Sequence, residues 1–226
     1  MTFLNHSTST RSARRFSGST AVLSGLIGII AFGFLIGALV SMFAGEPPAV
    51  WEARFAIHDA GVILQSLFMI PAVFALHALG RPRHPIASRT MLAIGLASLF
   101  FIVLCLSLDL AGVIWNTWYM VPQGVLGVWL VVVARIASLS RGMTRLATVV
   151  GLGLILVGSF PLGFAILVDP VVFHGPPSAM GVNPEGTEAA NRIIHIVLLI
   201  GSLIGVSTYP IWSILLGRTF RQRGTS

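Results

Sequence analysis

The chain has 226 residues, of which 55% are hydrophobic and only 9% are charged, and its mean hydropathy is +0.91. A soluble domain carries about 25% charged residues, so this composition excludes a water-soluble globular protein and indicates a chain built for a lipid bilayer. The net charge of +7 comes from fourteen arginines and no lysine. Because the arginines stand in short groups between apolar runs, they argue against a nucleic-acid-binding surface and are typical of membrane topology signals.

The first apolar run follows the arginine-containing segment "RSARRFSGST", residues 11–20. It extends from Ala21 to Ala44, which is longer than the roughly 7–15 apolar residues of a secretory signal. The sequence therefore predicts a retained membrane helix rather than a cleaved leader. Within it, Gly33 and Gly37 form a GxxxG step, which favours close packing against another helix of the bundle.

Five further apolar runs have lengths near the roughly 20 residues that cross a bilayer. Each must be a helix, because the hydrocarbon core offers backbone groups no other partner. We therefore predict an all-α, polytopic membrane bundle in a single domain over 20–217, with tails over 1–19 and 218–226. The six transmembrane helices are predicted at 20–44, 56–79, 90–114, 120–138, 146–168 and 192–216.

Orientation follows from the arginines. Twelve of them fall in the N-terminal segment, the second and fourth connections and the C-terminal tail, whereas only Arg54 and Arg192 fall on the other side. The positive-inside rule then predicts that both termini are cytoplasmic, in a multi-pass protein of the cell (inner or plasma) membrane. All seven acids lie on the predicted outer side, and an aromatic belt is predicted at the same level. The belt comprises Trp51, Trp115, Trp118 and Tyr119.

The last outer connection, from Asp169 to Asn191, is the longest and contains four prolines. A loop of this length without an apolar period is usually functional or mobile. Two interpretations are open: an ordered cap over the outer end of the bundle, or a surface loop.

Polar side chains recur near the outer ends of the predicted helices, where an ionisable group in a membrane calls for a partner. The stretch "RFAIHDAGVILQ", residues 54–65, places His58 and Gln65 on one helical face and turns Asp59 about 100° away. Asp109 most needs a partner, and Arg192 or a protonated histidine is the expected one. The predicted polar pocket comprises His58, Asp59, Gln65, Asp109, Asn116, Gln123, Asn191, Arg192 and His195.

Several functions of this cluster are open. His58, Asp59, Asp109 and His195 are suitable metal ligands, but no HExxH or paired-histidine spacing supports a metal site. Haem is disfavoured because His58 and His77 would lie about 28 Å apart along one helix. An Asp/His pair suits acid–base chemistry on a lipid or isoprenoid. The plain alternative is interhelical hydrogen bonding that only fixes packing. No cofactor and no metal is predicted.

The chain resembles a group of uncharacterised six-helix bacterial integral membrane proteins. The resemblance rests on the arginine-rich start before a glycine-rich first span, on "VPQGVLGVWLVVVARIA", and on "YPIWSILLGRTF" near the end of the chain. It implies the six-helix architecture and no established activity.

The leading functional hypothesis is an outward-facing polar pocket for a small or lipidic ligand. The alternatives are a membrane-embedded enzyme that uses the Asp/His groups and an accessory or packing protein without a site. The expected partners are membrane lipids and a small lipidic ligand.

Overall fold

The computed structural model describes residues 4–114, 116–169 and 186–223, and its regular structure there is entirely helical. Six of its helical spans are long and apolar enough to cross a membrane, which confirms the predicted all-α class and the predicted number of spans. The elements are α1 (Leu4–Phe43), α2 (Pro48–Gly80), α3 (Pro85–Leu110), the 3-10 helix η1 (Asn116–Tyr119), α4 (Met120–Ile136), α5 (Arg141–Leu167), α6 (Glu188–Gly201), the π-helical segment η4 (Ser202–Val206) and α7 (Ser207–Arg223).

The helix ends follow local chemistry. Pro48 and Pro85 begin α2 and α3, where the missing proline N–H costs nothing because the first helical N–H groups have no intrahelical partner. The helix α3 ends at Leu110, just before Gly112, whose φ is positive at 70°. This end is four residues short of the predicted one. The helix α1 begins at Leu4 and so includes most of the segment predicted as a tail. The predicted loop 169–191 falls largely on residues outside the described ranges.

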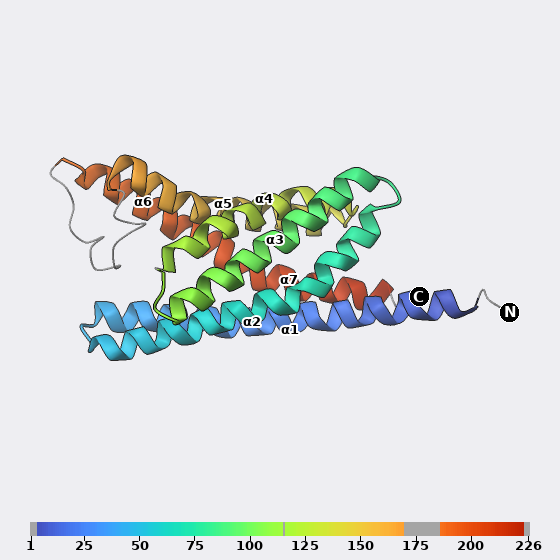
Figure 1. Ribbon diagram of the computed structural model, residues 1–226, viewed down its shortest axis with the longest axis horizontal. Helices are drawn as coiled ribbons and strands as arrows, with labels where there is room; N and C mark the ends of the chain where they lie inside the picture. Colours follow the sequence, from blue (N-terminus) through green and yellow to red (C-terminus); the bar gives the residue numbers. More distant parts are fainter. Residues whose placement is uncertain (1–3, 115, 170–185, 224–226) are drawn as a thin grey trace.

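The spans follow one another around a closed ring. Each of α1 to α5 packs on the next, α6 and η4 pack on α5, and α7 packs on α1 (Figure 1). Both ends of the chain and the connections α2–α3 and α4–α5 lie at one end of the bundle, here called the arginine-rich end. The connections that follow α1 and α3, the end of α5 and the start of α6 lie at the opposite, arginine-poor end (Figure 1).

The helix α5 approaches its neighbours through glycines on two faces. A Cβ at Gly151 would lie 2.5 Å from the carbonyl oxygen of Gly127, and one at Gly158 would lie 2.4 Å from the Cα of Gly124, so α4 is in direct backbone contact. A Cβ at Gly153 would lie 2.3 Å from the backbone nitrogen of Gly205 in η4. Small residues at these positions allow the van der Waals packing that drives helix association in lipid.

The predicted close packing at the GxxxG step of α1 is wrong for Gly33. A Cβ at Gly33 would meet nothing within 4 Å, and one at Gly37 would meet only a side-chain carbon of Arg54 at 3.7 Å. The close contacts of α1 are made instead at Gly25, against the Pro210 carbonyl of α7, and at Gly28, against Gln65 of α2. The positions that a helix uses for contact depend on where its neighbours cross it.

The last span contains a π-helical segment that ends four residues before Pro210. A proline ring inside a helix clashes with the carbonyl of the residue four positions earlier, which is Val206, the last residue of η4. The wider π turn relieves this clash. The hydroxyl groups of Ser207 and Thr208 donate hydrogen bonds to the carbonyls of Leu203 and Ile204. Two carbonyls of the π-helical segment thus receive side-chain donors from the same span, as suits backbone groups in a bilayer.

The arginine-rich half of the bundle is filled by large apolar side chains. Trp129 is buried between α3 and α4, where its indole N–H donates to the Met91 carbonyl at 2.7 Å and its ring covers Gly95. The other large, fully buried residues of this half include Val73, Leu76, Leu130, Trp212 and Leu216. The buried histidine and aspartate of the described bundle, His58 and Asp59, lie instead toward the arginine-poor end.

Candidate functional site

Two carboxyl groups from different helices meet near the arginine-poor end. Asp59 is buried on α2, and Asp109 is half-buried in the last turn of α3. Their side chains lie within hydrogen-bonding reach of each other. A hydrogen bond between two carboxyl groups requires a proton on one of them, because an ionised carboxylate only accepts. We call Asp59 and Asp109 the carboxyl pair.

Tyr119 is the third member of this arrangement. It ends the 3-10 helix η1, and it interacts electrostatically with both carboxyl groups. The sequence places Tyr119 in the aromatic belt and gives no sign of its proximity to the pair. Only the fold of the α3–α4 connection brings it there, so the spacing of residues along the chain could not have identified it.

His58 faces α1 through its Nδ1 and Asp59 through its Nε2. Its Nδ1 lies 3.0 Å from the Ala31 carbonyl of α1, and its Nε2 lies 3.9 Å from an Asp59 carboxyl oxygen. Gly61, one turn further along α2, is also pressed against Ala31. The face that carries His58 therefore packs on α1, and α2 turns Asp59 toward α3. The expected meeting of His58 with Asp109 is replaced by a meeting of two acids.

A small cavity lies one level deeper in the membrane. Its volume is about 30 Å³, and its lining includes Gln65 and Ser66 of α2, Gln123 of α4 and Tyr209 of α7. The Gln65 amide nitrogen and the Gln123 amide oxygen are buried without a hydrogen-bond partner. A polar cavity needs about 10–15 Å³ for each water molecule, so this one has room for about two. Water there would satisfy both amides.

The cavity and the carboxyl pair occupy successive levels of the same helix faces. Ser66 stands seven residues beyond Asp59, and Ile102, which also lines the cavity, stands seven before Asp109. Seven residues are two turns, or about 10 Å along a helix. The intervening turn is closed by Val62 and Leu106, both buried. The predicted pocket is thus two polar levels with an apolar layer between them.

The predicted pocket residues of the last span lie elsewhere. Asn191, Arg192 and His195 are on α6, which packs on α5. The His195 ring packs against the aromatic rings of Phe160 and Phe164, with centroids 5.4 and 6.2 Å away, and its Nδ1 lies 2.9 Å from the Asn191 carbonyl. Arg192 is exposed and is not the partner of Asp109. The side chain of Asn116, in η1, lies outside what the structure describes.

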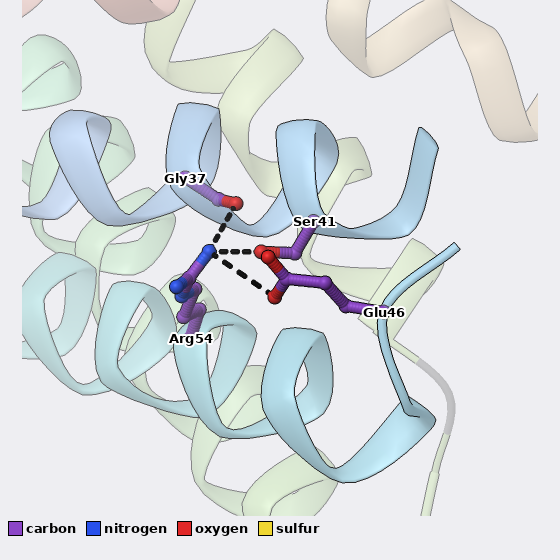
Figure 2. A network of polar contacts seen from close by, with 4 residues as sticks. All are labelled: Gly37, Ser41, Glu46 and Arg54. Atoms are coloured by element: carbon purple, nitrogen blue, oxygen red, sulfur yellow. Dashed lines mark hydrogen bonds and ion pairs between the residues drawn. The ribbon is translucent and has the colours of Figure 1, made fainter. Parts of the chain in front are cut away.

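Arg54 of α2 serves the α1–α2 connection. Its guanidinium donates to the Gly37 carbonyl at 2.9 Å and to the Ser41 hydroxyl, and it pairs with Glu46 at 3.9 Å (Figure 2). These contacts join the end of α1 to the start of α2 around the glycine turn at Gly45. Arg54, the arginine nearest to Asp59 in the sequence, is therefore engaged in joining α1 to α2. The carboxyl pair has no arginine partner among the described residues.

No three His, Cys, Asp or Glu side chains within the described ranges lie close enough together to hold a metal ion.

Comparison of the chain with protein-family models, with curated proteins and with solved structures gives no match. The resemblance to six-helix bacterial proteins stays a prediction. Functional inference therefore rests on the residues of the chain itself.

Proposed function

We propose that this multi-pass membrane protein binds a small ligand with a cationic group at its carboxyl pair. The observation that carries the proposal is the hydrogen-bonding reach between Asp59 and Asp109, two acids from different helices of an apolar bundle. Two carboxylates this close repel each other unless a proton or another cation lies between them. Among its described residues the chain supplies no arginine to the pair, and His58 Nε2 lies 3.9 Å from an Asp59 carboxyl oxygen. The pair therefore calls for a proton or for a cation from outside, and we propose the cation.

Access to the pair supports binding rather than packing alone. Asp109 is half-buried in the last turn of α3, next to the exposed residues of the α3–η1 connection. Asp59 is only 5% exposed and sits behind it. A cationic group can thus reach the pair from the arginine-poor end. It loses its contact with bulk water where it meets Asp59. The apolar layer of Val62 and Leu106 beneath the pair stops it from going deeper.

A membrane-embedded enzyme with acid–base groups is the second candidate. Two carboxyl groups that share one proton can act as acid and base, and Tyr119 beside them adds a hydroxyl group. This function requires a lipidic substrate to reach the pair from the side. It predicts that the lipids of the host membrane differ between cells with the wild-type protein and cells with Asp109→Asn, whereas ligand binding alone leaves the lipids unchanged.

Binding is tested by thermal denaturation of the purified full-length protein with increasing ethanolamine, choline, ammonium or sodium. A ligand that binds only the folded protein raises the unfolding midpoint, and at a concentration 100 times its Kd it adds about 2.7 kcal/mol. We expect at least one of the cations to stabilise the wild-type protein and to lose this effect with Asp109→Asn.

Glu52→Gln is the matched control, because Glu52 is an exposed acid at the same end and belongs to α2. It should respond like the wild type. Stabilisation that persists in Asp109→Asn, or the absence of stabilisation by any of the four cations, would rule out the carboxyl pair as the site.

The proposal also includes an orientation, with the arginine-rich end in the cytoplasm of a bacterial cell and the carboxyl pair facing outward. It is tested by single cysteines in a background in which Cys105 is replaced by alanine. A membrane-impermeant maleimide should label Ala49→Cys in intact cells and Pro82→Cys only after permeabilisation, because both sites are exposed at opposite ends. The reverse labelling would invert the topology and place the pair inside.

A further inference from the structure

A second candidate site lies at the arginine-rich end, where α1, α2 and α7 meet. A cleft of about 230 Å³ is lined there by Arg14 and Ser17 of α1, Phe74 and Ala78 of α2, and Phe220 of α7. Apart from Arg14 and Ser17 its lining is apolar. For comparison, an apolar protein cavity of about 150 Å³ binds a molecule of the size of benzene. The cleft is therefore large enough for a segment of an alkyl chain.

The cleft opens toward lipid rather than toward the centre of the bundle. Ile57, Leu64, Leu67 and Phe74 form an exposed stripe along α2, with exposed fractions of 44–50%. This stripe continues to Ala78, which is also exposed. In a bilayer such a face contacts acyl chains. Alanine at position 78 leaves a hollow in the stripe, because its side chain is too short to fill the space between the helices.

The charged groups at the rim of the cleft are arginines, so the rim is positively charged. Arg14 is exposed and makes no ion pair with any described residue, and a side-chain carbon of Arg221 packs against Gly18, one turn along α1. The described acids all lie toward the opposite end of the bundle or in its connections. The chain thus offers Arg14 no described carboxylate, and an anion for its guanidinium must come from the membrane or the solvent.

From these features we propose that the cleft binds one anionic phospholipid of the leaflet at the arginine-rich end. An acyl chain lies between Phe74, Ala78 and Phe220, and the phosphate group accepts hydrogen bonds from Arg14. Guanidinium groups bind phosphate oxygens in a bidentate manner, and basic clefts between transmembrane helices on the cytoplasmic side are suited to anionic head groups. This site is separate from the carboxyl pair, and neither proposal depends on the other.

The test is native mass spectrometry of the purified full-length protein, titrated with phosphatidylglycerol or with phosphatidylcholine of the same acyl chains. We expect the wild-type protein to bind phosphatidylglycerol more tightly. In Arg14→Gln its affinity for phosphatidylglycerol should fall about fivefold, which corresponds to the loss of one arginine interaction with an anionic lipid surface. The affinity for phosphatidylcholine should fall less, because the choline ammonium already offsets the charge of the phosphate that Arg14 contacts.

Two matched controls separate this site from general surface effects. Arg15→Gln removes the neighbouring charge, which is turned about 100° around α1, and should leave the preference intact. Ala78→Phe should fill the cleft and weaken the binding of both lipids. Leu64→Phe, on the same exposed stripe but outside the cleft, should leave the binding of both lipids unchanged. Equal binding of the two lipids by the wild-type protein, or equal losses in Arg14→Gln and Arg15→Gln, would overturn the proposal.

Discussion

Replacement of Gly153 by valine should separate the last span from α5 and destabilise the protein more than any other single change considered. A Cβ at this position would lie 2.3 Å from the nitrogen and 2.6 Å from the Cα of Gly205. Both are backbone atoms of the π-helical segment η4, so no side-chain rotation can relieve the clash. The two helices would have to move apart and would lose the close contact at Gly201 as well.

The expected cost is about 3 kcal/mol, at the upper end of the range for overpacked cores, because backbone rather than side chain must shift. Helix association in lipid depends on such close contacts, since no hydrophobic effect acts between the helices there. The measurement is the free energy of unfolding of the purified protein in a denaturing-detergent titration. The unfolding midpoint of Gly153→Val should be clearly lower than that of the wild-type protein.

Gly163→Val provides the control on the same helix. A Cβ at Gly163 would meet nothing within 4 Å. Both variants introduce the same β-branched residue into α5, so any effect of helix propensity is shared between them. We expect Gly163→Val to change stability by less than about 0.5 kcal/mol. Equal losses in the two variants would show that helix propensity, and not the contact with Gly205, decides stability at these positions.

Much of the fold could be predicted from the sequence because the bilayer leaves few alternatives. An apolar run of sufficient length must be a helix, and this rule located all six spans. The rule says less about helix ends. Residues 4–19 are too polar to lie in a hydrocarbon core, yet they contain no proline, and the helix α1 continues through them. Membrane boundaries and helix boundaries are set by different forces.

The candidate site could be predicted only in part. The sequence correctly placed His58 and Gln65 on one face of α2, because that follows from helix geometry alone. Which neighbour that face meets depends on packing, and Gly61 against Ala31 turns it toward α1. Asp59 consequently reaches Asp109. The sequence assigned Asp109 a basic partner, because an acid as the partner of an acid is uncommon in a membrane.

The coupling between the two acids is open to direct measurement. Asp59→Ala and Asp109→Ala should each destabilise the protein, because each removes one of two carboxyl groups within hydrogen-bonding reach and leaves the other without its partner. The double variant should cost less than the sum of the two, by about 1–2 kcal/mol, since the second substitution finds nothing left to break. Free energies of unfolding of the four proteins give this coupling energy.

The sign of the coupling energy distinguishes two acids joined by a proton or a cation from two ionised acids that repel each other. If a proton or a bound cation lies between the acids, they support each other and either single substitution is harmful. If both were ionised with nothing between them, removal of either would relieve repulsion and stabilise the fold. Substitutions at Asp59 and Glu52, which stand two turns apart on α2, should be additive within about 0.5 kcal/mol. Additive effects at Asp59 and Asp109 would mean that the acids do not act as a unit, and the cationic site would have to be abandoned.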